Sequence, residues 1–204
     1  MFGLIIISCS EDTPISSENL EELQPVDKYF DIEKLKSANN EEIDLISKFI
    51  TQNFSSKNTT SKINSKFDKP EVVSYTNLPG KTIVLNYKND GVKDISERAI
   101  ILVVNEDNEI ITNYKHKKID YGSYYTVKTY IEGNKWFNAK IKKDCEEIIE
   151  FNLKSGVSLK TSFRECAETA VKACVNDGEC AFICGILWKY CLGSIGLACA
   201  YHAI

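Results

Sequence analysis

The chain lacks an excess of basic residues. Its 204 residues include 25 lysines and arginines against 29 aspartates and glutamates, which gives a formal net charge of -4 at pH 7. Nucleic-acid-binding domains usually carry a basic stripe on a basic domain. Composition therefore gives no reason to expect a polynucleotide partner.

Catalytic motifs are also missing. The 2 histidines are His116, which lies among lysines, and His202, near the end of the chain, and neither lies near a recognisable nucleophile motif. There is no glycine-rich phosphate loop, no nucleophile elbow and no zinc-protease helix motif. We expect packed or solvated histidines, no catalytic residue, no cofactor and no enzymatic activity.

The chain does contain many cysteines, and they are unevenly distributed. Of the 8 cysteines, Cys9 lies near the start, Cys145 lies in the body, and the rest crowd into the C-terminal region: Cys166, Cys174, Cys180, Cys184, Cys191 and Cys199. Such crowding indicates a disulfide framework if the chain is exported, because cytosolic thiols are kept reduced. We expect these six to pair among themselves, which leaves Cys145 as a buried free thiol or as an intermolecular or alternative disulfide partner.

Metal, redox and membrane-spanning interpretations of the same region fit less well. Typical zinc sites and thioredoxin-like sites use cysteines separated by two residues, and no such pair occurs here. The ligand-like spacings are Cys180 with Cys184 and Cys199 with His202, and we expect no metal. A transmembrane helix over residues 181–204 would be long enough, but Lys189 and several glycines interrupt the run.

The first residues resemble an export signal. The apolar run from Phe2 to Ile7 is short for a secretory signal and has no basic residue before it. However, Ile6-Ile7-Ser8-Cys9 resembles a bacterial lipobox, in which the cysteine is acylated and becomes the first mature residue. We interpret residues 1–9 as a truncated signal or lipobox-like segment with Cys9 as the lipidation site. The protein is then exported and either lipid-anchored to the cell envelope or secreted; a cytosolic start with a chance apolar run is the alternative.

Periodicity predicts an α+β body over residues 39–153, after a linker over residues 10–38. Asn39 and Glu42 have the spacing of a capping box before an amphipathic helix, the N-terminal helix of this body. From Glu71 to Leu153 the pattern changes to that of strands, with polar turns at residues 106–108 and 132–134. We predict an antiparallel β meander packed against the helix. Its tyrosines form either a binding surface or cross-strand packing pairs: Tyr114, Tyr121, Tyr124 and Tyr130.

Residues 154–204 are predicted to form a disulfide-stapled α-helical hairpin tail. Apolar residues at helical intervals indicate a first helix over about residues 158–176, and a turn at residues 176–178 precedes a second helix that begins at Glu179. We expect Gly193 and Gly196 to break the second helix and let Cys199 fold back. One pairing that fits joins Cys174 to Cys180, Cys166 to Cys191, and Cys184 to Cys199, although the sequence itself does not choose among the possible pairings.

The tail also resembles a known family. Phe182-Ile183-Cys184-Gly185-Ile186-Leu187, followed by Gly196-Leu197-Ala198-Cys199, is similar to the cysteine-rich C-terminal peptide of halocin-like bacteriocin precursors and, more loosely, to fulvocin-related bacteriocin proteins. The resemblance covers about residues 166–199. It implies that the tail is the antimicrobial part and that the preceding region acts as a leader or protective partner. This chain has fewer cysteines than the fuller family pattern and ends soon after Cys199.

These observations lead to a bacteriocin-like precursor as the main functional hypothesis. Its partner is membrane lipid or a cell-envelope target, and the residues expected to meet the bilayer are Phe182, Ile183, Ile186, Leu187, Trp188 and Tyr190. The alternative is a surface lipoprotein binding module, in which the tail is a structural cap packed on the middle domain. A third hypothesis is a self-protection protein, in which the middle domain associates with the tail and shields it.

Overall fold

The computed structural model describes residues 32–54, 66–88, 96–143, 148–154, 161–177, 180, 184 and 188–202. It contains one antiparallel sheet whose eight strands follow the order of the sequence. The lipidation site Cys9 and the leftover Cys145 lie outside the described residues. The strands are β1 (Ile32–Ser37), β2 (Glu71–Tyr75), β3 (Lys81–Asn86), β4 (Ser96–Val104), β5 (Ile110–Asp120), β6 (Tyr124–Ile131), β7 (Asn134–Lys142) and β8 (Ile148–Leu153), and the helices are α2 (Asn40–Phe54), α4 (Thr161–Asn176) and α6 (Trp188–His202).

The meander predicted between Glu71 and Leu153 is confirmed, because β2 begins at the first of these residues and β8 ends at the second. Each neighbouring pair of strands is antiparallel. The predicted turns lie where the chain adopts positive φ angles: Asn108 (60°) between β4 and β5, and Glu132 (47°) with Gly133 (83°) between β6 and β7. Two successive positive φ values give a turn whose twist matches that of the flanking strands.

The linker prediction is wrong for its last part. Residues 32–37 form β1, which pairs with β2 at the edge of the sheet. This segment is mostly exposed and contains three charged residues, Glu33, Lys34 and Lys36, so its composition resembles that of a linker. Edge strands are commonly short and charged, which limits pairing with other chains.

Helix α2 begins at the predicted capping box and follows β1 in the chain. The backbone N–H of Glu42 donates to Asn39 Oδ1 (3.0 Å), and the backbone N–H of Asn39 donates to Glu42 Oε2 (2.8 Å). The buried Glu42 carboxylate also forms ion pairs with Lys36 and Lys81, each at 3.1 Å. Burial opposes ionisation of Glu42, but the hydrogen bonds from Asn39, Lys81 and Lys36 outweigh it and hold its pKa below the ordinary value.

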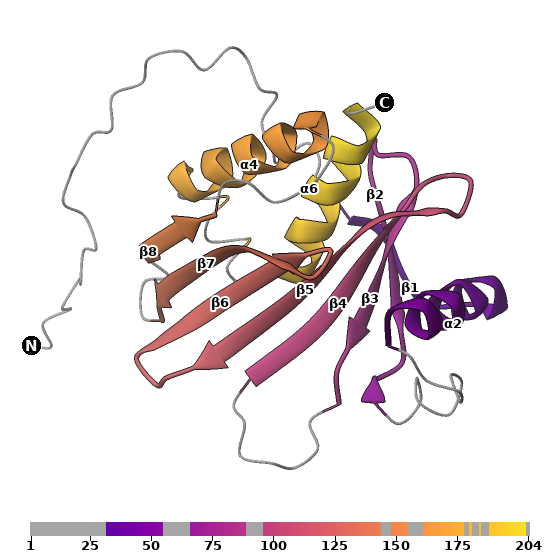
Figure 1. Ribbon diagram of the computed structural model, residues 1–204, viewed down its shortest axis with the longest axis horizontal. Coiled ribbons are helices and arrows are strands. Elements are labelled where there is room, and N and C mark those ends of the chain that lie inside the picture. Colours follow the sequence, from indigo (N-terminus) through magenta and orange to yellow (C-terminus); the bar gives the residue numbers. More distant parts are fainter. Residues whose placement is uncertain are drawn as a thin grey trace, which may run out of the picture.

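The helices cover opposite faces of the sheet (Figure 1). Helix α2 packs on one face through Ile46, Phe49 and Ile50, against Ile83 and the even-numbered positions of β4. Helices α4 and α6 pack on the other face, which includes the odd-numbered positions of β4: Ala99, Ile101 and Val103. Strand β4 is therefore buried on both sides from Ala99 to Val104. Figure 1 shows β5 to β8 extending away from α2.

The second tail helix differs from the prediction. Helix α6 begins at Trp188 and continues through both Gly193 and Gly196 to His202. A Cβ atom on Gly193 would lie 2.6 Å from the Tyr75 hydroxyl, and one on Gly196 would lie 2.7 Å from Tyr114 Cε2 and from the Tyr114 hydroxyl. The glycines allow α6 to approach the sheet closely, and the apolar burial that results compensates for their poor helix propensity.

Substitution of Gly196 by alanine is expected to destabilise the protein. The added methyl group would overlap the Tyr114 ring and lie 2.9 Å from Val103 Cγ2, and overpacking of this kind typically costs about 1–3 kcal/mol. Better helix propensity offsets about 1 kcal/mol of that cost. Urea unfolding should show a lower midpoint. The cost should be smaller in a Tyr114→Phe background, which removes one of the overlapping atoms, and an equal cost in both backgrounds would contradict this explanation.

Candidate functional site

Three disulfides connect the tail, defined here as residues 161–202, only to itself. They join Cys166 to Cys199, Cys174 to Cys180, and Cys184 to Cys191, with Cα–Cα distances of 5.5, 5.0 and 5.4 Å. The predicted Cys174–Cys180 pair is confirmed, whereas Cys166–Cys191 and Cys184–Cys199 are wrong. The reason is that α6 does not break, so about 12 Å of helix separates Cys191 from Cys199. Cys199 therefore meets Cys166 on α4, and Cys191 meets Cys184.

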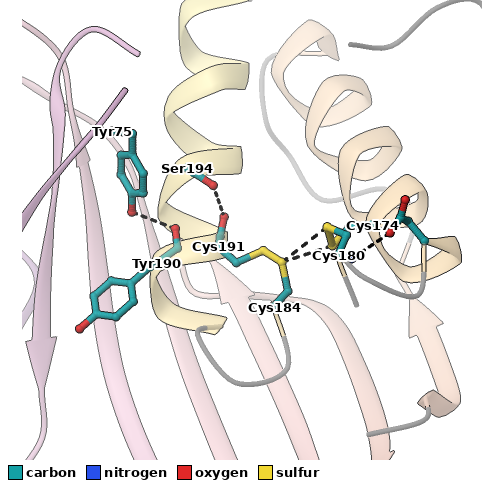
Figure 2. The surroundings of a disulfide bond; sticks show 8 residues. Tyr75, Cys174, Cys180, Cys184, Tyr190, Cys191 and Ser194 are labelled. Atoms are coloured by element: carbon teal, nitrogen blue, oxygen red, sulfur yellow. Dashed lines mark hydrogen bonds between the residues drawn. A yellow bond between two sulfur atoms is a disulfide. The ribbon is translucent and has the colours of Figure 1, made fainter. Parts of the chain in front are cut away.

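Two of these disulfides lie side by side at the start of α6, as Figure 2 shows. Cys174 Sγ lies 3.2 Å from Cys184 Sγ, and Cys180 Sγ lies 3.8 Å from it. The Sγ atoms of Cys174, Cys184 and Cys191 all lie within 4.8 Å of one another. Metals bind thiolates, and each of these sulfurs is already bonded to another sulfur. In this oxidised state the two disulfides touch without a covalent bond between them, and the covalent link between α4 and α6 is Cys166–Cys199.

Polar contacts hold the first turn of α6 against β2 and β3. The Tyr75 hydroxyl donates to the carbonyl of Tyr190 at 2.8 Å (Figure 2). Lys189 Nζ donates to Asn86 Oδ1 at 2.8 Å, and the Tyr190 hydroxyl donates to Glu71 Oε2 at 3.0 Å. Burial, followed by the charge of Glu71, raises the pKa of Tyr190 to about 12. The hydroxyl therefore stays protonated and keeps its donor role near neutral pH.

A histidine–tryptophan stack joins the sheet to the tail beside these contacts. The rings of His116 on β5 and Trp188 on α6 are nearly parallel, with centroids 3.2 Å apart. His116 Nδ1 lies 3.0 Å from Thr129 Oγ1 on β6, while Nε2 has no hydrogen-bond partner among the described residues. Burial, with the charges of Lys118 and Lys189, holds the pKa of His116 well below its ordinary value. The imidazole is therefore neutral in the folded protein.

An apolar cavity lies under the same stack. Its volume is about 80 Å³, and it extends from the His116–Trp188 stack to the neighbouring disulfides, with apolar walls from β6 to β8 and from both tail helices, including Phe137, Phe151, Val171 and Ile195. Atoms that line a cavity lack packing partners on one side and lose their dispersion contacts. The contact between tail and sheet is therefore weaker here than around Gly193 and Gly196.

The structure places the residues that were predicted to contact membrane as follows. Trp188 faces the sheet and is 4% exposed, and Tyr190 is half-buried with its hydroxyl on Glu71. The remaining four, Phe182, Ile183, Ile186 and Leu187, lie outside the described residues. In the part of the chain that the structure describes, no helix is both long and apolar enough to cross a membrane.

The meander tyrosines separate into two environments. Tyr114 is fully buried under Gly196, so it does not contribute to a binding surface. Tyr121 is 51% exposed and stacks on the half-buried Tyr124, with ring centroids 5.0 Å apart. Packing against neighbouring side chains therefore explains why tyrosines occur at most of these positions.

Sequence reasoning did not identify His116 as a contact to the tail. The available signal was its position two residues after Tyr114, which places both side chains on one face of β5. The partner on the tail could not be identified without the path of α6. Comparison with protein-family models, curated proteins and solved structures gives no match to this chain.

Proposed function

We propose that the protein is an exported, bacteriocin-like precursor in which the sheet shields the tail until the tail is released. One observation carries the proposal: every disulfide of the tail closes within the tail, while α6, the more apolar of the two tail helices that the structure describes, is covered by the sheet. The two parts of the described chain are thus joined by the backbone and by non-covalent contacts. A single backbone cleavage between β8 and α4 would leave only the non-covalent contacts between them, so that the tail could dissociate.

The surface of α6 supports membrane action after release. Residues 191–200 are all buried, and most of them are apolar. A helix that is apolar on all sides is stable either inside a protein core or in a lipid environment. Once separated from the sheet, this surface would be exposed to water, and transfer to a bilayer would bury it again.

Stable disulfides require an oxidising compartment, which supports export, with the protein either lipid-anchored through Cys9 or secreted. In the released tail, the bilayer contacts would be Phe182, Ile183, Ile186, Leu187, Trp188 and Tyr190. Trp188 would have to leave its stack on His116 to make such a contact.

A cell-envelope binding module with the tail as a permanent cap is the second candidate. This candidate is favoured by the close packing of α6 on the sheet, which is typical of a permanent hydrophobic core. Gly193 lies against Tyr75 and Thr82, and Gly196 lies against Tyr114 and Val103. In this case the sheet would depend on α6 for stability, and cleavage would not separate the two parts.

Controlled cleavage distinguishes the two candidates. Residues 155–160 would be replaced by a site-specific protease sequence, and the protein would be cut without reduction and mixed with vesicles that contain brominated lipids. We expect quenching of tryptophan fluorescence only after the cut, because Trp188 then enters the acyl region. A Trp188→Phe variant of the cut protein should lose most of the quenching.

Two results would favour the capped binding module instead. The tail would co-elute with the sheet after cleavage, and the vesicles would leave tryptophan fluorescence unchanged. The antimicrobial part of the proposal has a separate readout, which is growth inhibition of related bacterial strains by the oxidised tail after its separation. A tail that enters vesicles and inhibits no strain would contradict that part alone.

A further inference from the structure

Basic side chains gather on the sheet face opposite the tail. The basic face, as we define it, consists of residues from four neighbouring strands: Arg98, Lys115, Lys117, Lys128 and Lys140. Adjacent positions on these strands, such as Tyr114, His116, Val127 and Ala139, are buried on the tail side, so alternation places the basic residues on the other face. A direct contact agrees with this, since Lys115 Nζ lies 4.9 Å from the ring centroid of Phe54 on α2.

The strand register places like charges directly opposite one another. Arg98 on β4 pairs with Lys117 on β5, and Lys117 pairs with Lys128 on β6. With strands about 4.8 Å apart, this row of three positive charges extends over about 10 Å. Like charges at directly opposed positions destabilise a sheet. None of these three forms an ion pair with an acidic side chain in the described part of the chain.

Acidic residues are rare at the strand positions of this face, although they exceed basic residues in the whole chain and helix α2 at the other end of the face carries exposed Glu41 and Asp44. The register places thirteen positions of β5, β6 and β7 on this face, and none is acidic: Ile110, Asn113, Lys115, Lys117, Ile119, Tyr124, Thr126, Lys128, Tyr130, Lys135, Asn138, Lys140 and Lys142. Glu150 on β8 is opposite Lys140 at the border. Because the net charge is -4, the basic face is a local arrangement that the composition does not require.

The geometry of the face fits an extended surface. The charges are spread over four strands, and Lys140 Nζ lies 4.2 Å from the ring centroid of Tyr124. Half-buried Tyr124 and Tyr130 accompany the lysines, and tyrosines are enriched at membrane–water interfaces. Basic residues close to an anionic leaflet are attracted to it, and the attraction decays within a Debye length. Near contact, the local basic face therefore acts more strongly than the distant acidic residues.

We propose that the basic face docks on a membrane surface rich in anionic lipid headgroups. The headgroups would supply the negative charge that the row Arg98, Lys117 and Lys128 lacks within the described chain. Since the tail lies on the opposite face of the sheet, docking would hold the tail away from the bilayer before release. The inference deepens the proposed function by naming a partner surface, but it requires neither cleavage nor antimicrobial activity.

The test measures binding of the intact, oxidised chain to vesicles of two compositions. We expect binding to vesicles that contain phosphatidylglycerol, no binding to pure phosphatidylcholine vesicles, and a strong decrease in binding with salt. Each basic side chain near an anionic surface contributes roughly a fivefold factor to partitioning. The double reversal Lys117→Glu with Lys128→Glu should therefore reduce binding by at least about 25-fold.

Two controls separate this effect from a general change in charge or folding. The variant Lys34→Glu with Lys172→Glu changes the net charge by the same amount at exposed positions outside the basic face, and it should keep most of the binding. In a single Lys128→Glu variant, the new glutamate lies directly opposite Lys117 on β5, so a pair of like charges becomes a pair of unlike charges. Its melting temperature should therefore equal or exceed that of the wild type, while its binding to anionic vesicles falls.

Several outcomes would overturn the proposal. They are equal wild-type binding to both vesicle types, no binding to either, or equal losses in the two double variants. Binding to a soluble polyanion such as heparin without binding to anionic vesicles would also overturn it, because the partner would then be a polymer. Binding of the intact chain to anionic vesicles tests the basic face, whereas fluorescence quenching by brominated acyl chains tests insertion of the released tail. A negative result in either experiment therefore leaves the other interpretable.

Discussion

Loss of the Cys166–Cys199 disulfide is expected to lower the free energy of unfolding by roughly 4 kcal/mol. This bond has a sequence separation of 33 residues, the longest of the three. In the chain-entropy model, the stabilisation from a disulfide increases with the length of the loop it closes. The bond also joins the C-terminal part of α6 to α4, so its loss should loosen both helices on the sheet.

Urea unfolding of a Cys166→Ala, Cys199→Ala double variant measures this effect. The matched control is a Cys174→Ala, Cys180→Ala variant, whose bond has a sequence separation of 6 and should contribute only roughly 2–3 kcal/mol. Hydrogen exchange should show faster exchange in α6 for the first variant. Equal effects of the two double variants would show that loop length does not determine the stabilisation.

Acidification below about pH 6.5 is expected to weaken the contact between tail and sheet. His116 is buried and neutral, and its pKa lies well below the ordinary value because of burial and of Lys118 and Lys189. The unfolded chain therefore binds a proton at a higher pH than the folded chain does. Stability is fully present above the unfolded pKa and decreases as the pH falls towards the folded pKa, by up to about 1.4 kcal/mol for each pH unit.

The window between about pH 6.5 and 5.5 separates this effect from most of the carboxylate contribution. Glu42, whose folded pKa is lowered from 4.5, contributes stability that is lost only at lower pH. The unfolding free energy should fall across this window, with a slope of at most about 1.4 kcal/mol for each pH unit. Unfolding free energies measured at several pH values should show it in wild type and in the His202→Gln control. A His116→Phe variant, which keeps an aromatic ring against Trp188, should show little pH dependence there, and a wild-type slope in this variant would contradict the prediction.

Local patterns in the sequence predicted much of the body. Strand alternation and polar turns determined the meander, and the spacing of Asn39 and Glu42 determined where α2 begins, since each depends on residues close in sequence. β1 was missed because an exposed, charged edge strand has the composition of a linker. The path of α6 was missed because helix propensity treats glycine as a helix breaker, whereas here the missing side chains allow close contact with Tyr75 and Tyr114.

The functional surfaces were less predictable than the fold. Cys174–Cys180 could be predicted because the two cysteines flank one turn, whereas the other two pairs depend on how far α6 continues. The basic face could not be inferred from a net charge of -4, because total charge does not specify which residues share a face of the sheet. Alternation within β5 places Lys115 and Lys117 on one face, but the row with Arg98 and Lys128 requires the register.

The closure of all three disulfides within the tail has a consequence for how strongly the tail is held. In the intact chain, the tail and the sheet belong to one molecule, and a short linker of this kind typically gives an effective concentration on the order of millimolar. After one backbone cut, the same contact becomes an ordinary bimolecular equilibrium. The fraction of tail bound to the sheet then depends on the protein concentration, so dilution alone would favour the free tail.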